Sequence, residues 1–220
     1  MNLQYTILEN DDCKNKLERY LEFINHVNKK EKSIITELFY PIIITTYQCK
    51  CKKEIYTFQR MLDIPLLLPD KVTKITIENL FNNYFNEEKV EFNDICQNCG
   101  KILHHIKKVK ISKLPKILIL SLQRLDFINN KKNKCDVVFQ NELDMKSYID
   151  EDCANTNNTS YHLYGIIYHK GEIDFGHYIS FINIYGENYW YEFNDVIIKN
   201  VGSELKSYSD TYILFYIKDL

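Results

Sequence analysis

The C-terminal part of the chain, from residue 161 to residue 220, contains only segments that are typical of β-strands. These segments are rich in aromatic and β-branched residues, and Gly171, Gly176 and Gly186 interrupt them. Short runs of this kind separated by glycine predict hairpins. We place the strands at residues 161–169, 177–185, 188–193, 196–198 and 212–217. The C-terminal part is therefore expected to form an antiparallel sheet.

Helical periodicity is confined to earlier segments. Apolar residues recur three or four positions apart near the N-terminus, and Asp11 or Asp12 is a suitable N-cap. The predicted apolar face consists of Leu17, Tyr20, Leu21, Phe23 and Ile24. Further helices are predicted around residues 34–39 and 75–85. Helices followed by an antiparallel sheet indicate the α+β class.

The middle of the chain contains two predicted strands and two polar loops. Residues 114–122 form a short apolar run after a proline, and residues 102–111 mix β-branched with basic residues. Both patterns favour strands, the first of them central in a sheet. The polar segments 129–134 and 150–160 are predicted to be loops or turns.

Charge and hydropathy exclude several classes of partner. The chain has 28 Lys and Arg against 30 Asp and Glu, which gives a net charge of −2. That balance argues against nucleic acid as a partner, because general polyanion binders usually present a basic face. No run reaches the roughly 18–20 apolar residues of a membrane span, so no membrane partner is expected. The first residues lack the pattern of a signal peptide, which predicts an intracellular protein of the cytoplasm, the nucleus or both.

The cysteines suggest a metal site. Cys49 and Cys51 form one pair, and Cys96 and Cys99 form a second, which Gly100 follows. Two such pairs supply four thiolates, which would close a structural Zn²⁺ site and leave no ligand position for catalysis. No catalytic cofactor is therefore expected. The alternative is four reduced cysteines without a metal in a lysine-rich loop.

The other cysteines have no histidine or basic residue beside them in the sequence. They are Cys13, Cys135 and Cys153. Because catalytic partners need not be adjacent in sequence, this observation only makes a catalytic role less expected. We interpret these three as ordinary surface or core thiols.

A series of short motifs in the C-terminal part resembles the ubiquitin-specific protease family, the papain-like cysteine deubiquitinases. The motifs occur in the family's order over residues 161–216. They are Tyr161-x-Leu163-x-Gly165, His169-x-Gly171, Gly176-His177-Tyr178, Trp190-Tyr191-x-Phe193-Asn194-Asp195 and Tyr212-x-Leu214-x-Tyr216. Upstream, Leu114-Pro115-x-x-Leu118 and Leu120-x-Leu122-Gln123-Arg124 are similar to strands of the same family, and the cysteine pairs fall where it has its fingers.

The resemblance implies a fold and a domain organisation. The expected fold is that of a papain-like cysteine protease, with the palm and fingers of a ubiquitin-specific protease and a truncated thumb. Residues 1–220 would form a single partial catalytic domain. Within it, residues 10–40 would be a helical remnant, residues 41–112 the zinc-finger-like fingers, and residues 113–220 the palm sheet with the histidine motif.

The same resemblance implies roles for individual residues. A thiol protease needs an imidazole that takes the thiol proton and a third group that orients the ring. His177 would be the general base, Asn194 and Asp195 would orient it, and Gly176 would let the chain turn tightly before it. The alternative is that His177 is a hydrogen-bonded histidine of the sheet. The residues expected to line the channel for the substrate's tail are Arg124, His169 and Tyr178.

The family's nucleophile box, of the form Gly-x-x-Asn-x-Gly-x-Thr-Cys, has no match in this sequence. Cys13 aligns with a later helix of the family. Two hypotheses follow. In the first, the chain is a deubiquitinase domain that, when complete, hydrolyses (iso)peptide bonds at the C-terminal Gly of ubiquitin. In the second, it is a catalytically inactive module that binds ubiquitin or ubiquitinated proteins. Both predict that these residues alone are inactive.

Overall fold

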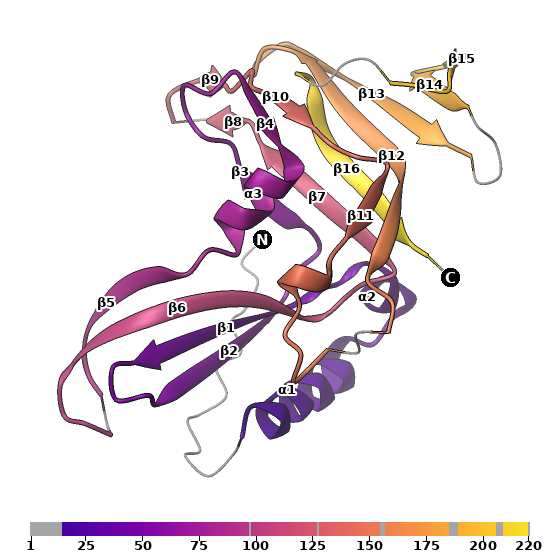
Figure 1. The fold of residues 1–220 in the computed structure, drawn as a ribbon. Helices are drawn as coiled ribbons and strands as arrows, with labels where there is room; N and C mark the ends of the chain where they lie inside the picture. The colour runs from indigo at the N-terminus through magenta and orange to yellow at the C-terminus, as the bar shows by residue number, and fades with distance from the viewer. Residues whose placement is uncertain are drawn as a thin grey trace. The chain divides into compact units, whose positions relative to one another are not determined.

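The structure is a computed structural model that describes residues 15–96, 98–126, 128–154, 157–184, 189–205 and 209–219. The predicted α+β class is confirmed, because helices are combined with two larger sheets whose strands are mostly antiparallel (Figure 1). The chain divides into two compact units. Unit 1 contains the chain up to Leu62 together with Phe85–Pro115 and Lys146–Asn158, and unit 2 contains Asp63–Tyr84, Lys116–Met145 and Thr159–Leu220.

Unit 1 contains a four-stranded antiparallel sheet. Its order is β2-β1-β6-β5, so the long strand β6 runs beside β1 (Figure 1). The strands are β1 (Ile42–Cys49), β2 (Glu54–Arg60), β5 (Glu88–Ile95) and β6 (Ile102–Lys113). The strand predicted at residues 102–111 is confirmed. The other three strands were not predicted. In β2 and β5, polar and charged residues hide the alternation expected of a half-buried strand, whereas β1 begins with three consecutive buried isoleucines and so shows no alternation either.

The helices of unit 1 are α1 (Lys16–Glu31) and α2 (Ile34–Phe39). The N-cap of α1 is Asn15, whose side chain accepts from the Glu18 amide in a capping box. The predicted N-caps Asp11 and Asp12 lie outside the described residues. The strength of a capping box explains why α1 begins at Lys16.

The buried face of α1 differs from the prediction. Phe23 is 2% exposed and stacks on Phe58 of β2, with ring centroids 5.7 Å apart. Leu17 and Leu21 are 45% and 50% exposed, so the prediction that they face the core is wrong. Aromatic rings bury more area than leucine and pair favourably with one another, which turns Phe23 and its neighbour Tyr20 toward the sheet.

Unit 2 is built on a second, eight-stranded sheet. Its order is β15-β14-β13-β12-β16-β7-β3, and β11 also pairs with β12. The strands are β3 (Ile64–Leu67), β7 (Ile117–Gln123), β11 (Glu142–Asp144), β12 (Ser160–Gly171), β13 (Gly176–Asn183), β14 (Trp190–Asn194), β15 (Ile197–Gly202) and β16 (Thr211–Lys218). All pairs are antiparallel except β3 with β7. The predicted C-terminal strands and the interior strand near residue 118 are thus confirmed, whereas the predicted break at Gly186 lies outside the described residues.

Short elements complete unit 2. They are β4 (Lys74–Thr76), α3 (Ile77–Tyr84), β8 (Leu125–Asp126), β9 (Lys131–Lys132) and β10 (Asp136–Val138); the 3₁₀ helix η1 (Lys146–Tyr148) belongs to unit 1. The predicted start of the third helix at Ile75 is wrong, because Ile75 pairs with Val137 of β10. The predicted polar loop 129–134 contains a turn and then β9, which pairs with β8.

The core of unit 2 follows the alternation of its strands. Leu118, Leu120 and Leu122 of β7 are fully buried, and Ile64 and Leu66 of the neighbouring β3 are fully buried as well. Strand β7 lies between β3, at the edge of the sheet, and β16, which in turn pairs with β12. Among the described residues, no helix has both the length and the apolar content that a membrane span requires.

The rotation of α1 can be tested by a matched pair of substitutions. Phe23→Ala is expected to lower the free energy of unfolding by about 3 kcal/mol or more, because it leaves a cavity against Phe58. Leu21→Ala is expected to change it by no more than about 0.5 kcal/mol, because half of that side chain already faces solvent. Urea unfolding followed by circular dichroism compares the two. A larger loss for Leu21→Ala would contradict the observed orientation of the helix.

Candidate functional site

The pairing of β13 with β14 brings His177 and Asn194 together. Ser180 lies opposite Phe193, so the start of β13 meets the end of β14. Nε2 of His177 lies 2.7 Å from Oδ1 of Asn194. The imidazole is about half exposed, which leaves it open to a reacting partner.

Asp195 follows at the turn between β14 and β15. Its φ of 52° lies in the left-handed region, and Asn194 pairs with Ile197 across this tight turn. An Asp carboxylate tolerates that conformation better than most side chains do. Oδ2 of Asp195 lies 3.9 Å from Nε2 of His177, but the side chain is 77% exposed. Because solvent screens this interaction, the Asp195 carboxylate contributes little to the stability of the fold.

The hydrogen bond to Asn194 selects the tautomer of His177. An amide Oδ1 can only accept, so Nε2 of the ring carries the hydrogen. In the neutral imidazole the other nitrogen, Nδ1, then has the free electron pair. Nδ1 is the atom of this site that can take a proton from a nucleophile.

His169 lies directly beneath the strand that carries His177. It pairs with Tyr178 in the β12–β13 ladder and is only 3% exposed. Burial, reinforced by the nearby Lys132 cation, lowers the pKa of His169, so the ring is neutral at neutral pH. The rings of His169 and Tyr178 lie 4.7 Å apart, and Tyr212 packs against both.

Gly176 is needed because the His169 ring lies against it. A Cβ at position 176 would come within 1.8 Å of Nε2 of His169. The expectation that Gly176 makes a tight turn is wrong, because the left-handed residue of this hairpin is Gly171, with a φ of 95°. The two glycines therefore have different functions in the same hairpin.

The three residues predicted to bind substrate lie in different environments. Tyr178 is 53% exposed on the surface of the sheet, and His169 is buried against it. Arg124 is 1% exposed, and its guanidinium donates to the carbonyl oxygens of Asn133, Cys135 and Thr211. Because these contacts hold strand ends together in the interior, the geometry favours a structural role for Arg124.

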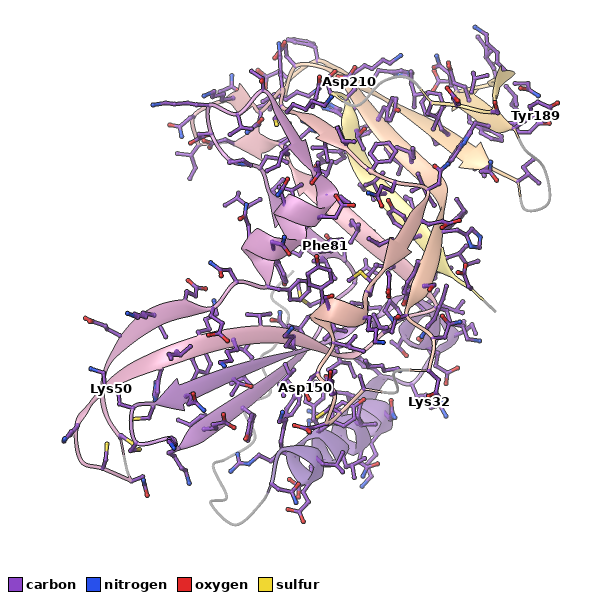
Figure 2. The ribbon with its side chains drawn as sticks, viewed as in Figure 1. Lys32, Lys50, Phe81, Asp150, Tyr189 and Asp210 are labelled. Atoms are coloured by element: carbon purple, nitrogen blue, oxygen red, sulfur yellow. The ribbon has the colours of Figure 1, made fainter. Side chains whose placement is uncertain are left out.

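Unit 1 brings the four cysteines of the two pairs into one cluster. Their Sγ atoms all lie within 4.8 Å of one another. Sγ of Cys49 lies 3.9 Å from that of Cys99, and Sγ of Cys51 lies 3.7 Å from that of Cys96. Figure 2 shows sulfur atoms gathered near Lys50, at the ends of the strands of this sheet.

Two similar turns present these thiols. Cys49 ends β1, and its amide donates to the carbonyl oxygen of Lys53, while the amide of Cys96 donates to that of Lys101. A left-handed residue lies in each turn, Lys52 in the first and Gly100 in the second. The left-handed lysine lets a pair separated by a single residue make the same kind of turn as the longer pair.

The cluster fits a tetrahedral metal ion. Zinc–sulfur bonds of about 2.3 Å place the sulfurs of a tetrahedron about 3.8 Å apart, close to the observed separations. The Asn98 side-chain amide donates to Sγ of Cys51 and, as the largest of several effects, lowers the pKa of this thiol to about 6. The sequence alone did not identify Asn98 as part of the cluster. A lowered pKa favours the thiolate form that a metal requires.

The other described thiols are poorly suited to nucleophilic attack. Burial raises the pKa of Cys135, and it raises the pKa of Cys153 to about 12. Both are therefore protonated at neutral pH, and a thiol in that form is a weak nucleophile. Cys13 lies outside the described residues.

The sequence was compared with known families and proteins. Residues 6–216 match the family described as ubiquitin carboxyl-terminal hydrolase. Ubiquitin carboxyl-terminal hydrolase 8 of Saccharomyces cerevisiae is 34% identical over 170 residues, which cover 73% of this chain and 36% of the relative. Ubiquitin carboxyl-terminal hydrolase 21 of Homo sapiens is 27% identical over 216 residues, which cover 95% and 37%. The chain thus spans little more than a third of these relatives.

Solved structures are similar over most of the chain. The SAGA DUB module that contains Ubp8, bound to ubiquitin aldehyde, matches with a TM-score of 0.75 and 28% identity, covering 92% of this chain and 49% of that chain. The same module bound to monoubiquitin matches with a TM-score of 0.74 and 27% identity, covering 92% and 48%. These similarities support the predicted palm-and-fingers fold.

The contact between Gly176 and His169 can be tested against a glycine on the neighbouring strand. Gly176→Ala is expected to lower the free energy of unfolding by at least about 2 kcal/mol, because the new methyl group overlaps the buried ring. Gly165→Ala is expected to stay within about 1 kcal/mol, because its Cβ would meet Phe215 at an ordinary 3.5 Å. Thermal unfolding of both variants measures the difference. Equal stability of both variants would show that the His169 ring does not occupy this position.

Proposed function

The chain belongs to the ubiquitin carboxyl-terminal hydrolase family, and on that premise we propose that it carries the general-base half of a cysteine deubiquitinase. The reaction is hydrolysis of the (iso)peptide bond at the C-terminal Gly of ubiquitin, by a site that another segment completes with a thiol nucleophile. The observation that carries the proposal is the 2.7 Å contact between Nε2 of His177 and Oδ1 of Asn194. It leaves Nδ1 as a proton acceptor on a half-exposed ring.

In the proposed first step, Nδ1 of His177 takes the proton of the thiol. The resulting thiolate attacks the carbonyl carbon of the C-terminal Gly, and a tetrahedral intermediate forms. The imidazolium then gives its proton to the leaving amine as the carbon–nitrogen bond breaks. Asn194 holds the ring in one tautomer and orientation, and Asp195 lies on the same side of the ring, 3.9 Å from Nε2.

In the proposed second step, water hydrolyses the thioester. His177 now takes a proton from the attacking water, and the carbon–sulfur bond breaks as the thiolate leaves. The products are the free carboxylate of ubiquitin and the thiol, which regains its proton from His177. The same nitrogen thus acts alternately as base and acid in each of the two steps.

The second candidate function is a catalytically inactive module that binds ubiquitin. The raised pKa values of Cys135 and Cys153 favour it, because neither described thiol outside the metal cluster is a ready nucleophile. It retains ubiquitin and ubiquitinated proteins as partners. The two functions differ only in whether a nucleophile reaches His177.

The proposed organisation is a single partial catalytic domain with fingers at residues 41–112 and a palm at residues 113–220. In this organisation Tyr178 presents its exposed ring to the tail of ubiquitin, supported from beneath by His169. The ubiquitin complexes of the similar solved structures support this assignment. Arg124 would act indirectly, by holding the strand ends behind the channel.

We further propose that Cys49, Cys51, Cys96 and Cys99 hold one structural Zn²⁺ ion. The separations between the four sulfur atoms support this proposal. The ion would cross-link the turn after β1 to the turn before β6. Four protein ligands leave no position for substrate, so its contribution would be to stability.

The metal proposal predicts about one equivalent of zinc in the purified protein. Chelation is expected to lower the melting temperature, because metal binding in such sites contributes directly to folding. Cys96→Ser is expected to reduce both the zinc content and the melting temperature, whereas Cys153→Ser retains the metal. Elemental analysis and thermal unfolding measure these effects. Protein without zinc that melts unchanged after chelation would contradict the proposal.

The catalytic proposal predicts that residues 1–220 alone do not react with a ubiquitin probe that carries a thiol-reactive C-terminus. A preceding segment that supplies the family's cysteine box is expected to restore hydrolysis. That activity is expected to fall by several powers of ten in His177→Ala, because a triad member is lost. Mass spectrometry and a fluorogenic ubiquitin substrate provide the measurements.

Control experiments separate the two candidate functions. NMR titration of labelled ubiquitin with the chain detects binding without catalysis, and both functions require shifts on ubiquitin. Restored activity supports the enzyme, whereas binding with no restorable activity supports the inactive module. Turnover by residues 1–220 that Cys13→Ala abolishes would show that the nucleophile is Cys13.

A further inference from the structure

The lysine-rich segment 130–134 contacts the turn that leads into His177. The segment was predicted only as a polar loop, yet every second side chain binds the turn between β12 and β13. Asn130 donates to Asp174 at 3.4 Å, and Lys134 pairs with Glu172 at 2.6 Å. Between them, Nζ of Lys132 donates to the carbonyl oxygen of Gly171 at 2.8 Å.

Lys132 differs from the other lysines of this segment because it is buried. Its side chain is 2% exposed, and its ammonium also donates to the carbonyl oxygen of His169. The carboxylate of Asp210 lies 3.6 Å from Nζ and balances the charge. A buried cation is costly unless hydrogen bonds and an opposite charge compensate it, and Lys132 has both. Asp210 lies just before β16 (Figure 2).

The two carbonyl groups that bind Lys132 lie opposite the start of β13. Gly171 pairs with Gly176, and His169 pairs with Tyr178, so positions 169 and 171 flank the residue paired with His177. The amide of His169 is held as well, since it donates to the carbonyl oxygen of Asp210. Lys132 thus fixes the strand against which the His177 backbone is aligned.

The position of the His177 ring depends on this backbone. Among the described residues, Asn194 is the partner that hydrogen-bonds the ring, and the ring is about half exposed. A half-exposed ring with one such contact has little side-chain packing to hold it in place. A shift of the hairpin would therefore move Nε2 away from Oδ1 of Asn194.

We propose that Lys132 is a positioning residue, whose buried ammonium locks the β12–β13 turn and thereby holds His177 in hydrogen-bonding distance of Asn194. The exposed contacts of Asn130 and Lys134 support the same turn from either side. The role of Lys132 in catalysis rests on the proposed function, whereas its role in holding the turn does not. Its test therefore requires neither ubiquitin nor a nucleophile.

The test compares Lys132→Met with Lys131→Met. Methionine retains an unbranched side chain that is one atom shorter and lacks the ammonium, which leaves the carbonyl groups of His169 and Gly171 without their partner. Amide hydrogen exchange in residues 169–178 is expected to become at least about tenfold faster in Lys132→Met. The loss of a buried charged hydrogen bond lowers the free energy needed to open the hairpin locally. Lys131 is an exposed neighbour, and Lys131→Met is expected to leave exchange unchanged.

A second measurement distinguishes positioning from general destabilisation. The ring nitrogens of His177 are observed by NMR, which reports the Nε2–H tautomer that Asn194 selects. Lys132→Met is expected to reduce the population of this tautomer, while exchange in β7 and β16 stays as in the wild type. An unchanged ring spectrum and unchanged exchange in a folded Lys132→Met protein would overturn the proposal.

A milder variant covers the case in which Lys132→Met does not fold. The double variant Asn130→Ala and Lys134→Gln removes only exposed contacts to the turn, and exchange in residues 171–175 is expected to rise about two- to threefold. No rise in this variant would also overturn the proposal. If the wild type does not bind ubiquitin, the proposed function fails, and the exchange and ring measurements still decide the role of Lys132.

Discussion

The antiparallel pairing of β13 with both of its neighbours is the constraint on which the candidate site depends. Its pairing with β14 carries Asn194 to the ring of His177, and its pairing with β12 places His169 beneath Tyr178. A strand register that slips by one residue would turn every side chain to the opposite face of the sheet. The distance between Nε2 and Oδ1 is therefore a consequence of backbone hydrogen bonds across three strands.

Close packing of side chains also constrains the β12–β13 hairpin. The ring of His169 takes the space that a side chain at position 176 would need, and burial keeps the ring neutral. A neutral ring avoids a second buried cation next to Lys132, which already has its compensating contacts. The β12–β13 hairpin thus packs a neutral imidazole beside the buried ammonium of Lys132.

The sheet of unit 1 is stabilised in a different way. Near α1 it has an aromatic and aliphatic cluster that includes Phe23, Ile44 and Phe58. At the turn after β1 the buried cluster consists of cysteines. At this turn the proposed Zn²⁺ site would supply the cross-link that apolar side chains provide near α1.

The sequence by itself determined the fold class, the C-terminal hairpins and the identity of the residues that meet at the site. Hydrophobic period and glycine breaks are local patterns that can be read directly from the sequence. The roles of His177 and Asn194 were implied by the family resemblance of the C-terminal motifs. Only the tertiary structure decided that Leu21 faces outward, that Arg124 is buried, that Gly176 makes room for His169 and that Lys132 is an interior cation. Each of these features depends on contacts between residues that are distant in the sequence. Such contacts form only when the chain packs in three dimensions.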